Sequence, residues 1–356
     1  MLMLPGGPAL SSTDIDAAVD GAFRRLACRA SAHGNEAVRL VRAARQAGAG
    51  GKRFRPRLVL TAFRAFAADD EVPRSVLEVA AGFELLHTAF VIHDDVIDRD
   101  VERRGRPNVA GVFRQQAVVA GSAPDQAVQL GDAAAILAGD LLLHEATRVI
   151  ATAELPAAQR SRLLDLVDRA ILVSAGGQLA DVEHAVLPRV PDAEEVLAAT
   201  SDKTAEYSFS APLQAGALLA GADDDTLAAL AAGGRSLGLA FQLVDDLIGA
   251  FGTAEQAGRE PGADLRQHKH TALLVLARRS ENWAEVRRAV AEAHQGPAQL
   301  RAAQEALETS GARRRVGLLV EDTLVEARTH FTDAALPGEA MTLLADLAAS
   351  IRERIP

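Results

Sequence analysis

Two pairs of adjacent aspartates, Asp94-Asp95 and Asp245-Asp246, lie in apolar stretches of the 356-residue chain at an offset of 151. Each pair follows a phenylalanine by four and five residues, at the end of a stretch with helical spacing. Aspartate is a poor residue for the interior of a helix, so two such pairs in apolar helices are locally costly. We therefore expect both pairs to serve the function of the protein.

The aspartates of the first stretch share one side of a helix. At about 100° per residue, Asp94 and Asp98 lie on nearly the same face one turn apart, with Asp95 beside them. This arrangement predicts that three carboxylates converge on a small volume. The residues that share a face on the second stretch are Gln242, Asp245, Asp246 and Gly249.

If the two helices face each other, five carboxylates share one cavity. Like charges about 4 Å apart repel by about 4 kcal/mol per pair at an effective dielectric of about 20, so such a set needs cations. Carboxylate oxygens favour Mg²⁺ or Mn²⁺ over zinc, and substrate phosphates commonly complete the octahedron of magnesium. A di-iron bundle is the competing interpretation, but it requires two Glu-x-x-His spacings, and Glu84 to His87 supplies one. The pattern therefore predicts a substrate that carries phosphate.

Basic residues provide counter-charges for such a phosphate. Three lysines, Lys52, Lys203 and Lys269, stand among 38 Lys and Arg residues, and they are candidates for sites that need a compact ammonium. Lys52 belongs to the glycine-hinged stretch 50–56, which offers backbone N–H groups and two arginines to an anion. Arg103-Arg104-Gly105 follows the first aspartates, where either phosphate binding or a helix C-terminus explains it.

The composition limits the class of protein. Hydrophobic residues make up 49% of the chain, and the single cysteine, Cys28, cannot form an internal disulfide, so the cytoplasm is the default expectation. The formal net charge of -10 argues against a nucleic-acid partner, because neutralising phosphates over a groove needs a basic excess. Every apolar stretch of about 18 residues contains a charge, so we expect no transmembrane segment.

Helix is predicted nearly throughout, because apolar residues recur at spacings of three and four and alanine and leucine are abundant. The predicted fold class is therefore all-α. We expect one domain over residues 1–356, with residues 1–12 a loose N-terminal extension, because no break is long enough for a flexible linker. The predicted helices span residues 14–30, 35–48, 53–68, 73–98, 128–153, 156–185, 192–220, 223–250, 271–294, 298–309, 311–334 and 338–354.

Seven motifs occur in a characteristic order along the chain. They are GGKRFRP at 50–56, HTAFVIHDDVIDRDVERRGRPNV at 87–109, AAILAGDLLL at 134–143, GGQLAD at 176–181, KTAEYSF at 203–209, FQLVDDLIG at 241–249 and GADLRQHKHT at 262–271. Over roughly residues 20–350 the chain resembles the all-trans isoprenyl diphosphate synthases of the polyprenyl synthetase family. The resemblance implies a single large helical bundle around a central apolar cavity, usually as a homodimer. It also implies head-to-tail condensation of isopentenyl diphosphate with an allylic diphosphate, which releases pyrophosphate.

The resemblance implies a role for each matching residue. The implied ligands of three Mg²⁺ ions, with Mn²⁺ as an alternative, are Asp94, Asp95, Asp98, Asp245 and Asp246. The residues implied to bind the allylic diphosphate or to line its developing cation are Arg103, Lys203, Lys269, Thr204 and Gln242. The implied isopentenyl diphosphate pocket consists of Lys52, Arg55, His87 and Arg104. The implied catalytic residues are Asp94, Asp98, Arg103, Lys203, Thr204, Gln242 and Asp245.

Two positions depart from the fullest family pattern. Gly249 stands where the second aspartate motif can end in a third aspartate, which removes one carboxylate from that side. Arg259, grouped here with the substrate-binding residues, stands where the family often has lysine. Both changes leave room for a slow or specialised enzyme. Activity is still expected, because Asp245 and the whole first cluster persist.

The length of the product is expected to depend on Phe90, one turn before Asp94 on the same stripe. Its ring is a candidate floor for the substrate-binding cavity, with Phe83 and Leu86 further away, although the small Ala89 beside it leaves that floor incomplete. An aromatic ring this close favours a short product, with C20 geranylgeranyl diphosphate ahead of C15 farnesyl diphosphate. The alternative is that Phe90 only packs one helix against another.

Two other functions remain open. A class I terpene cyclase shares the implied fold, but Thr253 stands where such cyclases usually carry an acidic residue, and a second diphosphate site has no use in a cyclase. A non-catalytic partner subunit of a heteromeric prenyl synthase would be expected to lose aspartates from both clusters. Here one position, Gly249, lacks its carboxylate.

Overall fold

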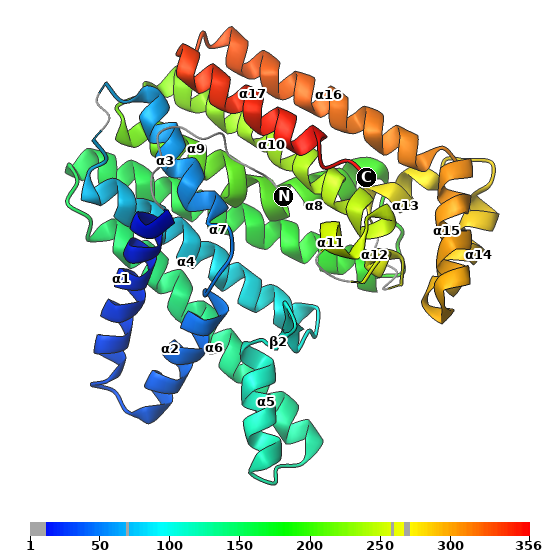
Figure 1. Cartoon of the computed structure of the whole chain (residues 1–356), viewed down its shortest axis with the longest axis horizontal. Coiled ribbons are helices and arrows are strands. Elements are labelled where there is room, and N and C mark those ends of the chain that lie inside the picture. The colour runs from blue at the N-terminus through cyan, green and yellow to red at the C-terminus, as the bar shows by residue number, and fades with distance from the viewer. Residues whose placement is uncertain (1–11, 69–70, 258–259, 267–270) are drawn as a thin grey trace. The chain divides into compact units, whose positions relative to one another are not determined.

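The fold was analysed in a computed structural model, which describes residues 12–68, 71–257, 260–266 and 271–356 (Figure 1). These residues are mainly helical, with two short strands, which confirms the all-α prediction. The described residues fall into two compact units, one of residues 12–167 with 218–220, the other of residues 168–217 with 221–356. The single-domain expectation stays a prediction.

The first unit is built around helix α4, which ends in the first aspartate pair. α4 packs against α1, α3 and α6, and its buried side chains include Phe83, Leu85 and Ile92. A Cβ atom at Gly82 would lie 3.0 Å from Cγ1 of Ile150, so this glycine lets α4 and α6 approach closely. The elements of this unit are α1 (Ser12–Ala30), α2 (Asn35–Ala47), α3 (Phe54–Phe66), α4 (Arg74–Ile97), β1 (Glu102–Arg103), β2 (Arg106–Pro107), α5 (Val109–Val119), α6 (Pro124–Ala151) and the first part of α7 (Ala157–Val186).

The second unit is built around α10, which carries the second aspartate pair. α10 packs against α16, α8, the π-helical turn η1 and α17, and Leu237, Leu243 and Val244 are among its buried residues. The elements of this unit are the rest of α7, α8 (Ala193–Ala205), η1 (Glu206–Ser210), α9 (Ala211–Leu219), α10 (Asp224–Phe251), α11 (Ala254–Ala257), α12 (Ala263–Arg266), α13 (Ala272–Ala277), α14 (Trp283–Glu292), the 3₁₀ turn η2 (Ala293–Gln295), α15 (Pro297–Thr309), α16 (Ala312–Asp333) and α17 (Gly338–Arg352).

Two of the predicted helices are interrupted. The helix expected over 192–220 contains η1, where the buried carboxylate of Glu206 accepts a hydrogen bond from Nε of Arg169 at 2.8 Å. A local π-helical turn of this kind is frequent at functional sites. The helix expected over 271–294 stops after α13, where the hydroxyl of Ser280 donates to the carbonyl of Ala277 at 2.7 Å and competes with the helical backbone pattern.

The segment after the first aspartates differs most from the expected structure. No strand or helix was predicted over 99–127, yet residues 102–107 form a two-stranded antiparallel hairpin and α5 follows it. α5 begins at a cap, because Oδ1 of Asn108 accepts a hydrogen bond from the backbone N–H of Gly111 at 2.9 Å. The missed signal was the dipeptide Arg104-Gly105, whose two positive φ angles of 55° and 70° suit a tight hairpin turn.

Three described helices are long and apolar enough to cross a membrane, judged by length and composition alone. They are α4, α6 and α10, and 67%, 39% and 61% of their most apolar windows are buried inside the protein. The hydrophobicity of α4 and α10 is thus explained largely by the cores they form. α6 leaves more of its apolar surface exposed. The expectation of no transmembrane segment stays a prediction.

Candidate active site

The first acidic cluster lies at the end of α4. Asp94 and Asp95 belong to the last turn of α4, and Asp98 caps it. Asp95 is buried, and its Oδ1 accepts hydrogen bonds from Nε and Nη2 of Arg103 at 2.9 and 2.6 Å. Burial raises the pKa of Asp95, and the guanidinium of Arg103 opposes this shift. One predicted metal ligand is therefore paired with one predicted diphosphate ligand.

The predicted convergence of three carboxylates does not occur in this part of the structure. Among the described residues, no three His, Cys, Asp or Glu side chains are grouped so that they could hold a metal ion. Asp95 turns to Arg103, Asp94 is partly buried and Asp98 is exposed. The physical reason is that neighbours in a helix diverge by about 100° and that the buried carboxylate takes the nearest cation.

The hairpin holds the two arginines that follow the aspartates. Nδ2 of Asn108 donates to the carbonyl of Asp100 at 2.8 Å, and the backbone N–H of Asn108 donates to the carbonyl of Val101 at 3.0 Å. These bonds tie the end of the hairpin to its start. Arg104 occupies the turn itself, with its backbone in the left-handed region. The alternative interpretation, in which these arginines lie at the C-terminus of a helix, is therefore wrong.

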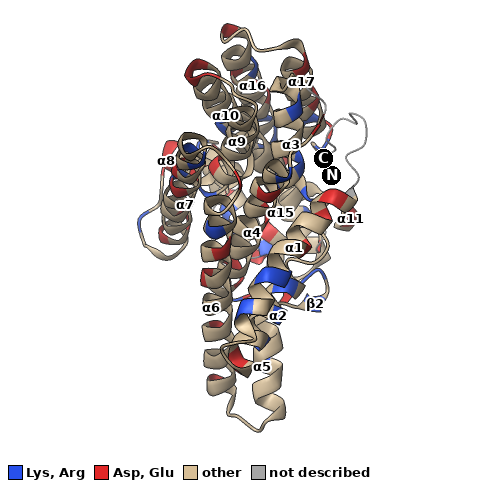
Figure 2. Cartoon of the chain, turned by 90° about the vertical axis from the view of Figure 1, so that its left-hand side faces the viewer, with Lys and Arg blue, Asp and Glu red and all other residues tan. Residues whose placement is uncertain are grey.

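The glycine-hinged loop lies against the side chain of Arg104. Gly50 and Gly51 have φ angles of 73° and 86°, which favour glycine. A Cβ atom at Gly51 would lie 3.6 Å from both terminal nitrogens of the Arg104 guanidinium. The structure thus brings the loop that carries Lys52 and Arg55 next to Arg104, and the family resemblance implies that these residues share one pocket. That they bind an anion together stays a prediction. Figure 2 shows basic residues in blue on this part of the chain.

His87 lies among the same arginines. Its pKa is held well below its ordinary value of 6.5, by burial first and then by the charges of Arg55, Arg103, Arg104 and Arg53. The imidazole is therefore neutral at pH 7. It can donate one hydrogen bond and accept another, while the arginines supply the positive charge.

Arg53 has a structural role at the start of α3. Its Nη1 donates to Oε1 of Glu84 and to the carbonyl of Gly48 at 2.8 and 2.9 Å, and its Nε donates to Asp16 at 2.8 Å. These contacts fix the left-handed backbone at Arg53, where α3 begins. They also engage the carboxylate of Glu84, which removes the remaining argument for a di-iron site.

The second acidic cluster includes the carboxylate of Asp264, which the sequence analysis did not single out, besides Asp245 and Asp246. Asp246 is buried on α10, and Nε2 of Gln242 lies 3.4 Å from its Oδ1. Burial, followed by the charges of Asp264 and Asp245, raises the pKa of Asp246 from 3.8 to about 8. Asp264 is itself buried on α12, inside the motif at 262–271. Its position in that motif was the available signal.

Asp245 is paired with an arginine far along the chain. Nη2 of Arg354 donates to Oδ1 of Asp245, and the same guanidinium lies 4.5 Å from the centre of the Phe241 ring. Arg354 follows α17 and is 12% exposed, whereas the carboxylate of Asp245 is 40% exposed. No local sequence pattern predicts this pair, because 109 residues separate its members.

Lys203 and Thr204 lie near the end of α8, one turn before η1. Nζ of Lys203 donates to Oδ2 of Asp181 on α7 at 2.8 Å. Both Lys203 and Thr204 are partly buried. A side chain at Gly177 would collide with the backbone of α8 at Lys203, so this glycine permits the close contact of α7 and α8.

Other predicted site residues are placed as follows. Lys52 is exposed at the loop before α3, and Phe90 is partly buried on α4. Arg259 and Lys269 lie outside the described residues, so their predicted roles stay predictions.

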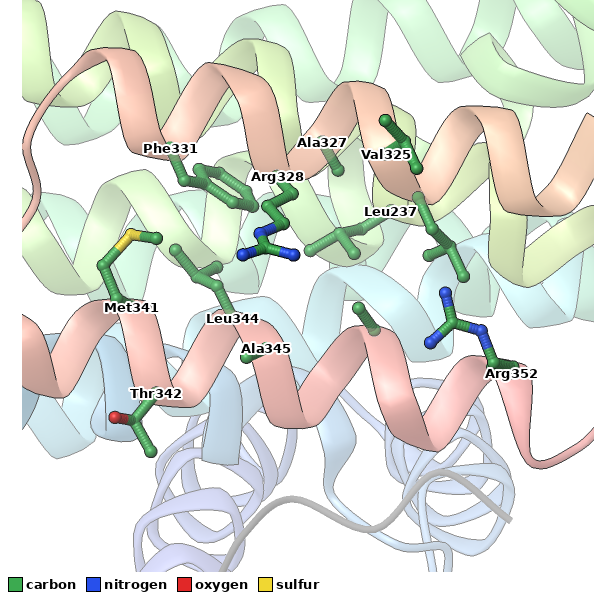
Figure 3. A pocket seen from close by; sticks show the side chains of 12 residues that line it. Leu237, Val325, Ala327, Arg328, Phe331, Met341, Thr342, Leu344, Ala345 and Arg352 are labelled. Atoms are coloured by element: carbon green, nitrogen blue, oxygen red, sulfur yellow. The ribbon is translucent and has the colours of Figure 1, made fainter.

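A cavity of about 520 Å³ in the second unit lies at α10, α16 and α17, apart from these charged residues (Figure 3). Leu237, Phe331 and Leu344 are among its mostly apolar lining, and Arg328 and Arg352 reach it from α16 and α17. Its lining, as far as the described residues show it, includes none of the predicted site residues. The chemistry of the second unit is therefore expected at Asp245 and Asp246, not in this cavity.

Solved structures share the fold of this chain. A geranylgeranyl pyrophosphate synthase from Corynebacterium glutamicum, solved with isoprenyl diphosphate and magnesium, matches with a TM-score of 0.87 at 28% identity over 96% of this chain and 98% of that one. A polyprenyl synthase from Caulobacter crescentus, solved with calcium and isoprenyl diphosphate, matches with a TM-score of 0.70 at 30% identity over 97% and 99%. The fold is that of the all-α isoprenyl diphosphate synthases.

Sequence comparison identifies the family. Residues 39–308 match the family described as Polyprenyl synthetase. The chain is 33% identical to a (2E,6E)-farnesyl diphosphate synthase of Mycobacterium tuberculosis over 319 residues, which is 85% of this chain and 80% of that protein. It is 32% identical to a geranylgeranyl diphosphate synthase of Methanosarcina mazei over 229 residues, which is 64% of each chain. The chain belongs to the polyprenyl synthetase family, and the protein is a prenyltransferase.

Proposed function

We propose that the protein joins isopentenyl diphosphate to an allylic diphosphate in the head-to-tail sense and releases pyrophosphate. The observation that carries the proposal is the cluster of basic residues around His87, where Arg104 meets the loop of Gly50 and Gly51. A second diphosphate site is needed for this condensation, and a terpene cyclase has no use for it. The names of both relatives described above support the reaction class.

The acidic residues fit a divalent cation by their donor chemistry. Magnesium commonly takes one or two carboxylates and completes its octahedron with water and phosphate oxygens, so a group of three protein ligands is not required. Asp94 and Asp98 on α4 would hold Mg²⁺ or Mn²⁺, as would Asp245 and Asp246 on α10. A bound cation would stabilise the negative charge that develops on the leaving pyrophosphate. We propose three ions in the active site.

The basic residues divide between two diphosphates. Lys203 and Arg103 would bind the allylic diphosphate, with Lys269 nearby, because fixed cations that strengthen as negative charge develops lower the barrier to ionisation. Thr204 and Gln242 would line the allylic cation. The residues that would bind isopentenyl diphosphate are Lys52, Arg55, His87 and Arg104. The released pyrophosphate would accept the final proton, so no separate side-chain base is needed.

We propose a C20 product in preference to a C15 product. Relatives of both kinds match this chain. The ring of Phe90 favours a short product, and the small Ala89 beside it leaves the floor incomplete. Replacement of Phe90 by alanine is expected to lengthen the products. Chromatography of dephosphorylated products tests this. An unchanged length distribution would show that Phe90 is not the floor of the substrate-binding cavity that the family resemblance implies.

We propose that the protein is a homodimer. α6 exposes a set of large apolar side chains that a second copy would cover: Val128, Leu130, Ile136 and Leu137. Light scattering is expected to give twice the mass of one chain, and Leu137→Glu is expected to reduce it. A wild-type protein with the mass of one chain would contradict the proposal.

We also propose a cytoplasmic location, because the single cysteine, Cys28, is free and exposed. Cell fractionation tests this location.

One assay tests the reaction. The protein is incubated with labelled isopentenyl diphosphate, Mg²⁺ and, in turn, a C5, C10 or C15 allylic diphosphate, and products are separated by length. Label in a longer prenyl diphosphate is the expected result. Hydrocarbon released from geranylgeranyl diphosphate alone would instead indicate a cyclase. No turnover by the protein alone, with activity restored by a second subunit, would indicate a non-catalytic partner.

A further inference from the structure

The guanidinium of Arg354 is held at the second acidic cluster by two contacts of different kinds. It forms an ion pair with Asp245, and it lies 4.5 Å from the centre of the Phe241 ring. An arginine that stacks on an aromatic face and pairs with a carboxylate is restrained in position as well as in charge. Since Phe241 precedes Asp245 by one helical turn, both contacts lie on the same side of α10.

The segment that carries Arg354 is anchored on both sides. Ile351, at the end of α17, is completely buried. Nη2 of Arg313 on α16 donates to the carbonyl oxygen of Pro356 at 2.5 Å, and the Arg313 guanidinium lies 4.6 Å from the centre of the Phe251 ring. The position of Arg354 beside Asp245 therefore follows from the packing of α10, α16 and α17.

A neighbouring arginine points elsewhere. Arg352 donates to both carboxylate oxygens of Glu321 on α16, with distances between 2.6 and 3.0 Å. Arg352 also lines the cavity of Figure 3. Two arginines with the same charge, two residues apart, thus serve different partners, and Arg352 provides a matched control for Arg354.

The cluster that Arg354 meets is acidic. Asp245 lies next to Asp246, whose pKa is raised in part by the charge of Asp264. The ion pair found at this cluster among the described residues is Asp245–Arg354. A guanidinium and a divalent cation at the same carboxylate repel each other, so each weakens the binding of the other.

We propose that Arg354 is a positioning residue, which forms an ion pair with Asp245 in the metal-free protein and releases this carboxylate when a divalent cation binds. It keeps Asp245 oriented before the metal arrives, and it raises the metal concentration that the second cluster requires. This inference rests on the proposed function, because it takes Asp245 to be a metal ligand.

The test measures binding of Mn²⁺ alone to the full chain, by calorimetry and by the electron paramagnetic resonance signal of free Mn²⁺. Arg354→Met keeps an apolar stem against Phe241 and removes the charge, so the fold is expected to persist. We expect this variant to bind Mn²⁺ at the Asp245-dependent site at least threefold more tightly than the wild type. Arg352→Gln and the charge-retaining Arg354→Lys are expected to remain within twofold of the wild type.

The Asp245→Asn background makes the result specific. There, Arg354→Met is expected to change Mn²⁺ binding less than twofold, because the shared carboxylate charge is gone. Unchanged or weaker binding in Arg354→Met alone would overturn the role of Arg354, as would an equal gain in the Asp245→Asn background. If the Asp245→Asn variant binds as much Mn²⁺ as the wild-type protein, Asp245 is not a metal ligand. The metal site of the proposed function then fails, and this inference fails with it.

Discussion

The two acidic clusters have the same sequence pattern and different surroundings. At the end of α4, Asp95 pairs with Arg103, eight residues later on the adjacent hairpin, and Asp98 is exposed. On α10, Asp245 pairs with Arg354, 109 residues later, and Asp246 is buried beside Asp264. Identical aspartate pairs can thus be neutralised by a local arginine or by one that only the completed fold supplies.

Burial separates the clusters further. The pKa of Asp246 lies at about 8, so this carboxyl is mostly protonated at pH 7 in the absence of a cation. The first cluster keeps Asp98 at an exposed position. Each cluster holds one arginine, so we expect a cation to bind more readily at the first, where Asp98 is exposed, than at the second, where Asp246 must also lose a proton.

The largest expected effect tests this ranking. Asp94→Asn is expected to lower kcat/KM by about 100- to 1000-fold, since loss of one preorganised electrostatic group has that scale. Asp245→Asn is expected to cost less, about 10- to 100-fold, because Gly249 already leaves the second cluster one carboxylate short. Steady-state kinetics with saturating Mg²⁺ measures both. A larger loss for Asp245→Asn would reverse the ranking.

A second prediction concerns the basic residues around His87. Arg104→Gln is expected to raise KM for isopentenyl diphosphate about 10-fold, the scale of one charge-assisted contact, with little change in KM for the allylic diphosphate. Arg106→Gln, at an exposed position on the same hairpin, is the control. Equal effects on both Michaelis constants would show that the hairpin does not distinguish the two substrates.

The third prediction concerns stability against pH in metal-free protein. The folded pKa of Asp246 is raised from 3.8 to about 8, so its contribution to stability is complete below about pH 4 and is lost as the pH rises through about 8. Asp246→Asn is expected to flatten this decline by a few kcal/mol in urea unfolding. Asp264→Asn is expected to move the decline to lower pH, because it removes a charge that raises this pKa. An identical pH profile in Asp246→Asn would contradict the assignment.

The smallest expected effect concerns Asn108, which caps α5 at the end of the hairpin. Asn108→Ala removes the side-chain hydrogen bonds to Gly111 and Asp100 and is expected to lower the free energy of unfolding by about 1 kcal/mol. Thermal unfolding measures this change. We also expect KM for isopentenyl diphosphate to rise less than in Arg104→Gln, because Arg104 keeps its charge. A KM increase larger than that of Arg104→Gln would show that the hairpin geometry outweighs the charge.

Sequence reasoning predicted what depends on nearby residues. The all-α fold follows from spacing and composition, and the approach of Arg104 to the loop at 50–56 agrees with what the family resemblance implied. The spread of the first three aspartates could not be predicted, because it depends on where the Arg103 side chain turns. Arg354 could not be assigned either, since tertiary packing alone brings it to α10, whereas Asp264 lies in the motif at 262–271 and could have been singled out there.

Gly139 on α6 sets the distance between two helices beside the first cluster. A side chain there would collide with the imidazole of His93, which precedes Asp94 directly and lies 3.3 Å from both the carbonyl of Ile136 and Oδ1 of Asp140. A single added methyl group would have to displace the His93 ring from its place against α6. The side chain next to Asp94 therefore keeps its position because the neighbouring helix has no Cβ atom at Gly139.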